Sequence, residues 1–369
     1  MMRVLIIMHS SNTVYGAAKS LQKLIRYSDW DIDIVYPNSL FHPVEKEIIN
    51  NYSFGKAKSI YRLFLPFRHK PVFEDFHYSA KDLLWETGKR ILEVFDRIKL
   101  KKIIKNGKYD YILLNSIVLY PIIEKKNNTI VYMRDFVYEK GKRLKRIINK
   151  LENAKKIIFI DKAITIPFRN TDLSYQVINN PFDMMDVNKL NREGVLLKYN
   201  LDKDKVVVSI VGAVAEDKGI DFVVQAFNQL KRDDVYLLVV GSGNSDYVNE
   251  CKHIATHNNI VFLGEIKDIT EIYCMTDYIL RADCVFATGR TVYEGLFSGC
   301  EIIMQIEEHS DVNDISQYND YKEKFHFYKV RNSASLVNEL SKVHKVNKGA
   351  SPGKTNINRY IQQINDYIN

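Results

Sequence analysis

The run from Thr288 to Cys300, TGRTVYEGLFSGC, has residue types and spacing that suit binding of a phosphate and a hydroxyl. It predicts a strand end, a turn at Gly289 and a short amphipathic helix that ends at Gly299. The first turn of such a helix presents backbone N–H groups and the positive end of the helix dipole, both of which favour a phosphate. Glu294, one turn in, is placed to bind a neighbouring hydroxyl. Ordinary α/β crossovers use the same pattern, so this run alone leaves both interpretations open.

Regular alternation of strands and helices in the second half predicts the framework that positions this run. We expect strands at Val206–Val214, Val235–Gly243, Ile260–Gly264 and Tyr278–Asp283, with helices at Asp221–Leu230, through Cys251 and at Ile269–Thr276. Such alternation is typical of a doubly wound parallel sheet. Ligands of these sheets bind beyond the carboxyl ends of the strands.

The first half predicts a second sheet of the same kind. Its expected strands are Arg3–Met8, Ile32–Pro37, Tyr109–Ser116, Thr129–Asp135, Lys155–Asp161 and Tyr175–Asp183. Two of them end in the polar pairs Asn115 and Ser116, and Arg134 and Asp135, which are therefore candidate ligand residues. Gly16 begins the helix after the first strand, where backbone without a side chain can approach a ligand closely. A plain tight turn explains Gly16 equally well.

A chain of 369 residues is long enough for two domains of about 150 to 200 residues each. The turn NNPFD marks a boundary, so we expect a first domain over residues 1–183 and a second over residues 184–352. The amphipathic pattern of Asn356–Ile368 predicts a last helix within residues 353–369, which we expect to return to the first domain.

The composition, 46% apolar and 27% charged, is that of a globular protein. No stretch reaches the about 20 apolar residues of a membrane span, and the start MMRVLIIMHSS is too short and polar for a secretory signal. We therefore expect a cytoplasmic protein. The four cysteines lack CxxC or Cys/His spacing, which predicts reduced, buried thiols and no zinc site.

The net charge of +8 is concentrated in the first half, where residues 81–108 carry nine Lys or Arg against four acids and Lys140–Lys150 is also basic. A basic face attracts nucleic acid, anionic lipid or a phosphorylated substrate, or is simply a solvated helix face. Residues 81–108 predict a helix that follows an aromatic stretch. Its apolar side comprises Leu83, Leu84, Ile91, Leu92, Val94, Phe95 and Ile98. This side either lies on an anionic membrane surface or packs on the helix's own sheet.

Four motifs resemble, in order and spacing, those of family 4 glycosyltransferases, which are retaining enzymes of the GT-B fold. They are VGAVAEDKGIDFVVQAF (211–227), VVGSG (239–243), VFLGEIKDITEIYCMTD (261–277) and GRTVYEGLFSGC (289–300). GAAKSL (16–21), TIVYMRD (129–135) and VINNPFD (177–183) resemble three further motifs of the family. The resemblance implies two Rossmann-like doubly wound parallel-sheet domains facing a central cleft.

The resemblance also implies roles for individual residues. Lys218 matches the lysine that neutralises the leaving diphosphate, and Glu294 the glutamate that holds the ribose hydroxyls. The N–H groups of Thr291 and Val292 resemble the phosphate-binding backbone. The other expected donor-binding residues are Gly16, Gly212, Gly243, Ile266 and Gly289. Arg134 and Asn115 are assigned to the acceptor side, and no metal or other cofactor is implied.

Two positions depart from the family pattern. The family commonly has arginine after the glycine of its first motif, whereas Ala213 follows Gly212 here; we expect Arg290 to supply the missing cation. The glutamate eight residues before the ribose-binding one is replaced by Phe286, which leaves the identity and orientation of the donor sugar open.

The implied reaction transfers a sugar from a UDP- or GDP-type nucleotide sugar to a hydroxyl with retention, by same-face attack through an oxocarbenium-like state. The basic first domain fits a lipid-linked glycan acceptor at the inner face of a bacterial membrane, in assembly of a surface polysaccharide such as capsule or O-antigen. A GT-B sugar-nucleotide epimerase or phosphorylase and a non-catalytic sugar-nucleotide-binding protein remain alternatives. A nucleic-acid-binding protein is disfavoured because no RNA-binding module is recognisable.

Overall fold

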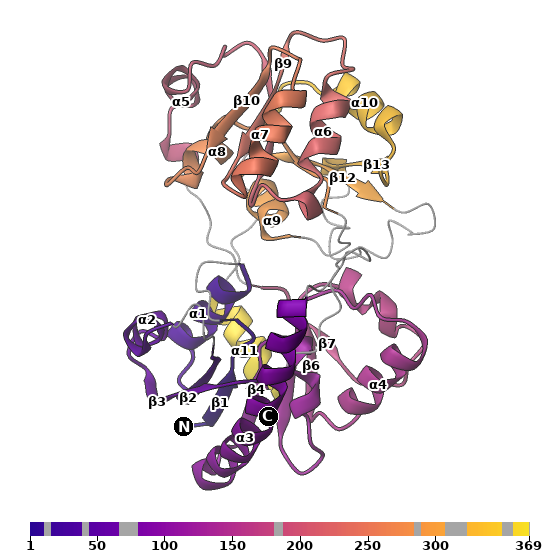
Figure 1. Ribbon diagram of the computed structural model, residues 1–369. Coiled ribbons are helices and arrows are strands. Elements are labelled where there is room, and N and C mark those ends of the chain that lie inside the picture. Colours follow the sequence, from indigo (N-terminus) through magenta and orange to yellow (C-terminus); the bar gives the residue numbers. More distant parts are fainter. Residues whose placement is uncertain are drawn as a thin grey trace. The chain divides into compact units, whose positions relative to one another are not determined.

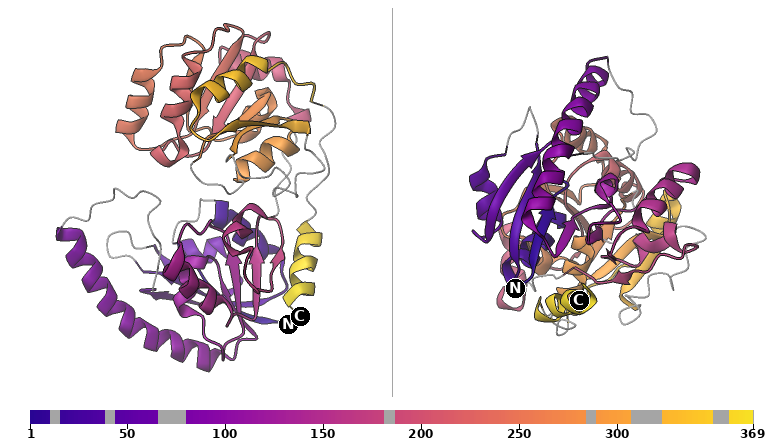
Figure 2. Two further views of the ribbon diagram at one scale, coloured as in Figure 1. Left: turned by 90° about the vertical axis from the view of Figure 1, so that its right-hand side faces the viewer. Right: turned by 90° about the horizontal axis from the view of Figure 1, so that it is seen from below.

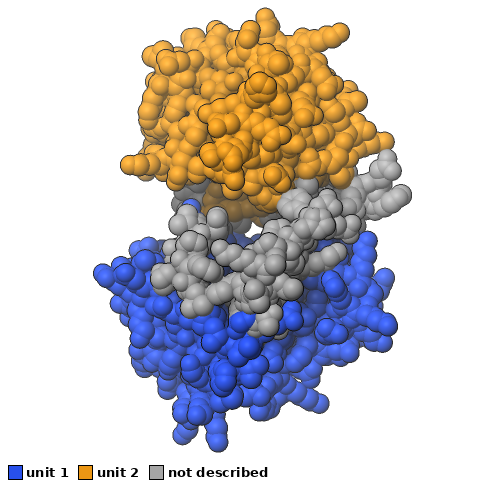
Figure 3. Space-filling model, viewed as in Figure 1, with its two compact units in different colours: residues 1–181, 356–369 blue, residues 182–355 orange. Residues whose placement is uncertain are grey.

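The computed structural model describes residues 1–10, 16–38, 44–65, 80–180, 187–283, 289–306, 323–348 and 357–368. These residues belong to two compact units (Figure 3). Unit 1 comprises residues 1–181 together with 356–369, and unit 2 comprises residues 182–355.

Unit 1 is built on a seven-stranded sheet whose pairs are all parallel, in the order β3-β2-β1-β4-β5-β6-β7. The strands are β1 (Arg3–Ile7), β2 (Asp31–Pro37), β3 (Ala57–Leu63), β4 (Tyr111–Leu114), β5 (Thr129–Met133), β6 (Lys156–Phe159) and β7 (Gln176–Val177). Central strands are continuous apolar runs because both of their faces are covered. Val4 of β1 is paired with Ile32 on one side and Tyr111 on the other, so the order of strands reverses between β1 and β4.

Helices of unit 1 come from both ends of the chain (Figure 1). They are α1 (Gly16–Tyr27), α2 (Lys46–Tyr52), α3 (Ala80–Gly107), α4 (Gly141–Leu151) and α11 (Ile357–Ile368), with the 3₁₀ turns η1 (Ile117–Ile122) and η2 (Ala163–Phe168). The C-terminal helix α11 packs beside α1 and buries Tyr360 and Ile364 in the core of this unit. Tyr111 in β4 donates a hydrogen bond of 2.6 Å to the carbonyl of Ile368, which fixes the end of α11 at the sheet.

Unit 2 repeats the same winding with six parallel strands in the order β10-β9-β8-β11-β12-β13. The strands are β8 (Val206–Val211), β9 (Val235–Val240), β10 (Ile260–Gly264), β11 (Tyr278–Arg281), β12 (Glu301–Ile306) and β13 (Phe325–Lys329). Its helices are α5 (Arg192–Lys198), α6 (Ile220–Phe227), α7 (Ser245–Ile254), α8 (Ile269–Met275), α9 (Arg290–Phe297) and α10 (Ser333–Lys342), with the turns η3 (Val187–Lys189) and η4 (Glu216–Lys218). Two apolar clusters, one on each face, form its core.

The predicted class of two doubly wound parallel sheets is confirmed, and both sheets have the strand order of nucleotide-binding folds. Helix α2 and strand β3 have no counterpart among the elements predicted from the sequence. The strand expected at Tyr175–Asp183 is reduced to the two residues of β7. Cys251, Cys274 and Cys300 are buried free thiols, as expected, while Cys284 lies outside the described residues. No described helix is long and apolar enough to cross a membrane.

Candidate donor and acceptor sites

Glycines at the carboxyl ends of β8 and β9 let two loops run in contact at the edge of the unit 2 sheet. Gly212 has φ +141° and Gly241 has φ +142°, which side-chain-bearing residues rarely adopt. A Cβ on Gly241 would lie 1.7 Å from the carbonyl oxygen of Gly212, and one on Gly243 would lie 1.7 Å from that of Val214. Side chains are therefore excluded here, and backbone lines this part of the edge.

Lys218 lies at the point where the strand order of this sheet reverses, between β8 and β11. Its Nζ is 2.9 Å from Oδ2 of Asp283, just beyond β11, and 3.1 Å from Oδ2 of Asp217. Burial lowers the pKa of the Lys218 ammonium, but the carboxylates of Asp283 and Asp217 outweigh burial and raise that pKa above its usual value. Lys218 is therefore a fixed positive charge at the position where doubly wound sheets bind their ligands.

A second cation, Arg281, shares the carboxylate of Asp283 with Lys218. Its Nη2 is 3.1 Å from Oδ2 of Asp283, and its side chain is only 11% exposed. Its Nη1 is buried and has no hydrogen-bond partner among the described residues. The guanidinium lies directly against the start of α9, because a Cβ on Gly289 would be 2.7 Å from Nη1. A cation at the positive end of a helix dipole is unfavourable by itself, whereas an anion bound there would be stabilised by both.

Glu294 is buried on α9, at 8% exposure, with both carboxylate oxygens engaged. Oε2 accepts a 3.0 Å hydrogen bond from the Tyr273 hydroxyl, and Oε1 is 2.5 Å from Nε of Arg290. Burial raises the pKa of Tyr273 and the negative charge of Glu294 raises it further, so this hydroxyl stays a donor. A carboxylate has about four acceptor positions, so Glu294 retains capacity for a ligand hydroxyl while its orientation is fixed.

The remaining residues that were predicted to bind the sugar donor lie in different environments. Thr291 and Val292 form the first turn of α9 as expected, but the Val292 N–H donates to the carbonyl of Gly289 at 3.1 Å and is thus already used. Ile266 follows β10 and packs against the same core cluster as Val292. Phe286 lies outside the described residues.

Arg134 and Asn115 are brought together at the carboxyl edge of the unit 1 sheet. Nε of Arg134 donates to Oδ1 of Asn115 at 2.7 Å, and Nη1 donates to Oδ1 of Asn180 at 3.0 Å. Arg134 is 6% exposed and lies over the ring of Tyr132, at 4.8 Å from its centroid. Its Nη2 is buried without a partner among the described residues. Because a buried guanidinium normally satisfies all its donors, this atom favours an anionic or carbonyl ligand.

Asp135 and Gly16 complete this edge. Asp135 accepts a 2.6 Å hydrogen bond from Ser116 rather than pairing with the neighbouring Arg134. Gly16 is the first residue of α1, after β1, on the same edge. Its contact with a donor phosphate stays a prediction.

His9, just beyond β1, was missed by the sequence analysis. Burial lowers the pKa of its imidazole and the charge of Arg134 lowers it further, while Asp135 acts in the opposite direction. The only signal available was a histidine following a buried strand. Asp283, Arg281 and Tyr273 were likewise missed as site residues, because a charge at the end of a strand and a tyrosine in a helix carry no motif.

The depressed pKa of His9 predicts a pH-dependent stability. The unfolded chain binds this proton near pH 6.5, above the folded pKa, so stability is present above about pH 6.5 and is lost as pH falls below it. We expect His9→Asn to flatten the fall in urea-unfolding free energy between pH 7 and pH 5. His253→Asn, at an exposed position on α7, is the matched control. An identical pH slope for His9→Asn and wild type would contradict this role.

Residues 205–317 match the family described as "Glycosyl transferases group 1". A glycogen synthase of Flavobacterium johnsoniae is 26% identical over 168 residues, which are 43% of this chain and only 35% of that protein. Among solved structures, Anabaena Alr3699/HepE in complex with UDP and glucose aligns over 99% of both chains at 16% identity, with a TM-score of 0.62. WaaG, described as a glycosyltransferase involved in lipopolysaccharide biosynthesis, aligns over 92% of this chain and 90% of its own at 13% identity, with a TM-score of 0.59. These likenesses confirm the GT-B fold class.

Proposed function

We propose that this chain is a retaining glycosyltransferase whose unit 2 binds a nucleoside diphosphate sugar of the UDP type. The observation that carries the proposal is the pair of cations, Lys218 and Arg281, that share the carboxylate of Asp283 beside the start of α9, the helix that carries the buried Glu294. The UDP and glucose bound by Alr3699/HepE, which shares this fold, support a UDP-linked donor.

The two cations of this cluster are placed to contact a diphosphate. Lys218 and Arg281 share the carboxylate of Asp283, Lys218 also contacts Asp217 at 3.1 Å, and the start of α9 adds partial positive charge next to Arg281. A diphosphate gains negative charge as the sugar leaves it, and preorganised cations stabilise that charge most in the transition state. Glu294 would hold the ribose hydroxyls with the carboxylate positions that Tyr273 and Arg290 leave unused.

In this mechanism the protein positions the reactants and supplies no nucleophile. The acceptor hydroxyl attacks from the face that the leaving diphosphate vacates, and a phosphate oxygen takes the hydroxyl proton. The new glycosidic bond forms as the bond between sugar and phosphate breaks, so the anomeric configuration is retained. Side chains and backbone N–H groups carry the stabilisation, and the proposal invokes no metal or other cofactor.

The acceptor is proposed to be a lipid-linked glycan in bacterial surface-polysaccharide assembly, bound at the Arg134 edge of unit 1. Nη2 of buried Arg134 has no hydrogen-bond partner among the described residues, which supports an acceptor that carries a phosphate or carbonyl oxygen. The likeness to WaaG, with its role in lipopolysaccharide biosynthesis, supports this class of acceptor. We also propose that the protein works in the cytoplasm, peripherally on the inner membrane face.

A thermal-shift screen of UDP, GDP and ADP tests the donor class. Ligand at about a hundredfold excess over Kd adds about 2.7 kcal/mol to native stability, which corresponds to a rise of about 5 to 10 °C for a domain of this size. We expect this rise with UDP and a smaller one with GDP or ADP. Inorganic phosphate at the same ionic strength is the control. Melting that no nucleotide changes would argue against donor binding.

A further inference from the structure

The outward side of α3 exposes an ordered apolar stripe. Ile91, Val94, Phe95 and Ile98 are 58%, 59%, 61% and 53% exposed. Their spacing of i, i+3, i+4 and i+7 places them on one face of the helix. In Figure 2, the first half of α3 stands away from the body of unit 1. The expectation that this apolar side packs on its own sheet is therefore wrong for these residues.

The two acids among the described side chains of α3 point inward instead. Glu93 is 4% exposed and Asp96 is 6% exposed. Asp96 accepts a 2.7 Å hydrogen bond from the backbone N–H of Phe64 and pairs with Lys99 at 2.8 Å, which anchors the helix to the segment after β3. Among the side chains of α3 that the structure describes, the exposed charges beside the stripe are positive: Arg90, Arg97, Lys99, Lys101, Lys102 and Lys105. The outward face of the helix is thus apolar and cationic.

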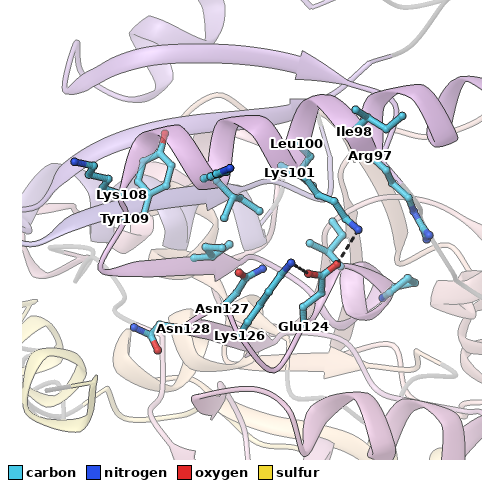
Figure 4. Close-up of a pocket in the computed structure, with 15 residues that line it drawn as sticks. Arg97, Ile98, Leu100, Lys101, Lys108, Tyr109, Glu124, Lys126, Asn127 and Asn128 are labelled. Atoms are coloured by element: carbon cyan, nitrogen blue, oxygen red, sulfur yellow. Dashed lines mark ion pairs between the residues drawn. The ribbon is translucent and has the colours of Figure 1, made fainter.

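A cavity of about 530 Å³ lies at the C-terminal end of this face, between α3 and the segment after η1 (Figure 4). Ile98, Leu100 and Ile104 supply apolar lining, and Arg97, Lys101, Lys105 and Lys108 supply cations. Its carboxylate, Glu124, is 3.4 Å from Lys101 and 3.3 Å from Lys126. Burial raises the pKa of Glu124, but these lysines outweigh burial and hold that pKa below its usual value. One carboxylate among five cations leaves the cavity strongly positive.

We propose that this face, the α3 stripe with its adjoining cationic cavity, docks the protein on bilayers that contain anionic phospholipid. The stripe enters the boundary between headgroups and acyl chains, and the cavity holds a lipid phosphate. Charge complementarity favours an anionic bilayer, because an apolar stripe flanked by cations matches acyl chains beneath phosphates. Nucleic acid fits less well, because Ile91, Val94 and Ile98 offer no ring for base stacking. The docking does not require the proposed transfer activity.

Flotation with vesicles tests the surface. We expect wild type to float with phosphatidylcholine vesicles that contain phosphatidylglycerol, and to be released by salt. Val94→Ser with Phe95→Ser removes apolar side chains without a change of charge, and Lys101→Glu with Lys105→Glu reverses two cavity charges. Each pair should reduce binding at least tenfold. Lys231→Glu with Lys252→Glu, on exposed positions of unit 2, makes the same change of net charge and should bind like wild type.

Three results would overturn the proposal. The first is equal binding of wild type to vesicles of pure phosphatidylcholine, and the second is unchanged vesicle binding of both variant pairs. The third is a wild type that is dimeric by light scattering and becomes monomeric with Val94→Ser and Phe95→Ser. Circular dichroism and the melting temperature, measured on every variant, show whether unit 1 with α3 is still folded, and the UDP-induced thermal shift separates the two proposals. Lost vesicle binding with an intact UDP shift supports the docking surface alone. A wild type that floats without any UDP response would leave the docking surface standing and remove the transferase.

Discussion

Lys218→Ala is expected to lower the turnover of sugar transfer by about two to three orders of magnitude, the usual cost of removing one preorganised donor to a developing negative charge. Lys218 carries a raised pKa and lies beside Asp283, where the strand order reverses. The diphosphate is most negative as the sugar departs, so loss of this ammonium affects the transition state more than donor binding. The signature is therefore a fall in kcat that exceeds any rise in KM.

The fold should survive this substitution. The Lys218 side chain is 32% exposed, and Asp283 keeps its contact with Arg281 at 3.1 Å, so no buried charge is left alone. Initial rates with UDP-sugars, circular dichroism and melting temperature together check the prediction. Lys231→Ala, at an exposed position of the same unit, is the control. Near wild-type turnover in Lys218→Ala would show that Lys218 does not stabilise the leaving group.

The framework of the site was predictable because it follows from patterns local in sequence. Continuous apolar runs such as β8 and β9, each followed by glycines and a helix, indicate parallel strands whose loops meet at one edge. Strand β3 was missed because its residues, AKSIYRL, are only partly buried. A strand at the sheet border needs less apolar sequence than a central one, so its pattern is weaker.

The orientation of α3 could not be predicted for a different reason. Helical periodicity shows which residues share a face, but not whether that face turns inward. Here the inward face carries Asp96, whose carboxylate accepts from the backbone N–H of Phe64. This hydrogen bond joins residues that are 32 positions apart in the chain, so the apolar pattern of the helix does not predict it.

The second cation of the donor site becomes apparent only through the contact between Lys218 and Asp283, which are 65 positions apart in the chain. The sequence predicts that Arg290 replaces the arginine absent at Ala213. Its Nε is instead 2.5 Å from Glu294, whereas Arg281 shares Asp283 with Lys218. Binding measurements with UDP and UMP can therefore decide which of the two arginines contacts the diphosphate.

Arg281→Leu is expected to weaken UDP binding about tenfold to a hundredfold, the range for a hydrogen bond to a charged group, and to affect UMP much less. This follows if Arg281 contacts the second phosphate, since only UDP carries one. Isothermal titration with UDP and UMP measures the difference. Arg281→Lys should restore part of the UDP affinity because it keeps the charge, although it loses the fork geometry of the guanidinium.

Arg290→Leu provides the matched comparison on the same helix start. Because Arg290 pairs with Glu294, its loss should disturb the ribose contact and weaken UDP and UMP by the same factor. The ratio of UDP to UMP affinity then falls in Arg281→Leu and stays constant in Arg290→Leu. The reverse result would assign the diphosphate to Arg290, the residue that we expect from the sequence to supply the missing cation. It would then follow that the 2.5 Å pair with Glu294 opens when the donor binds.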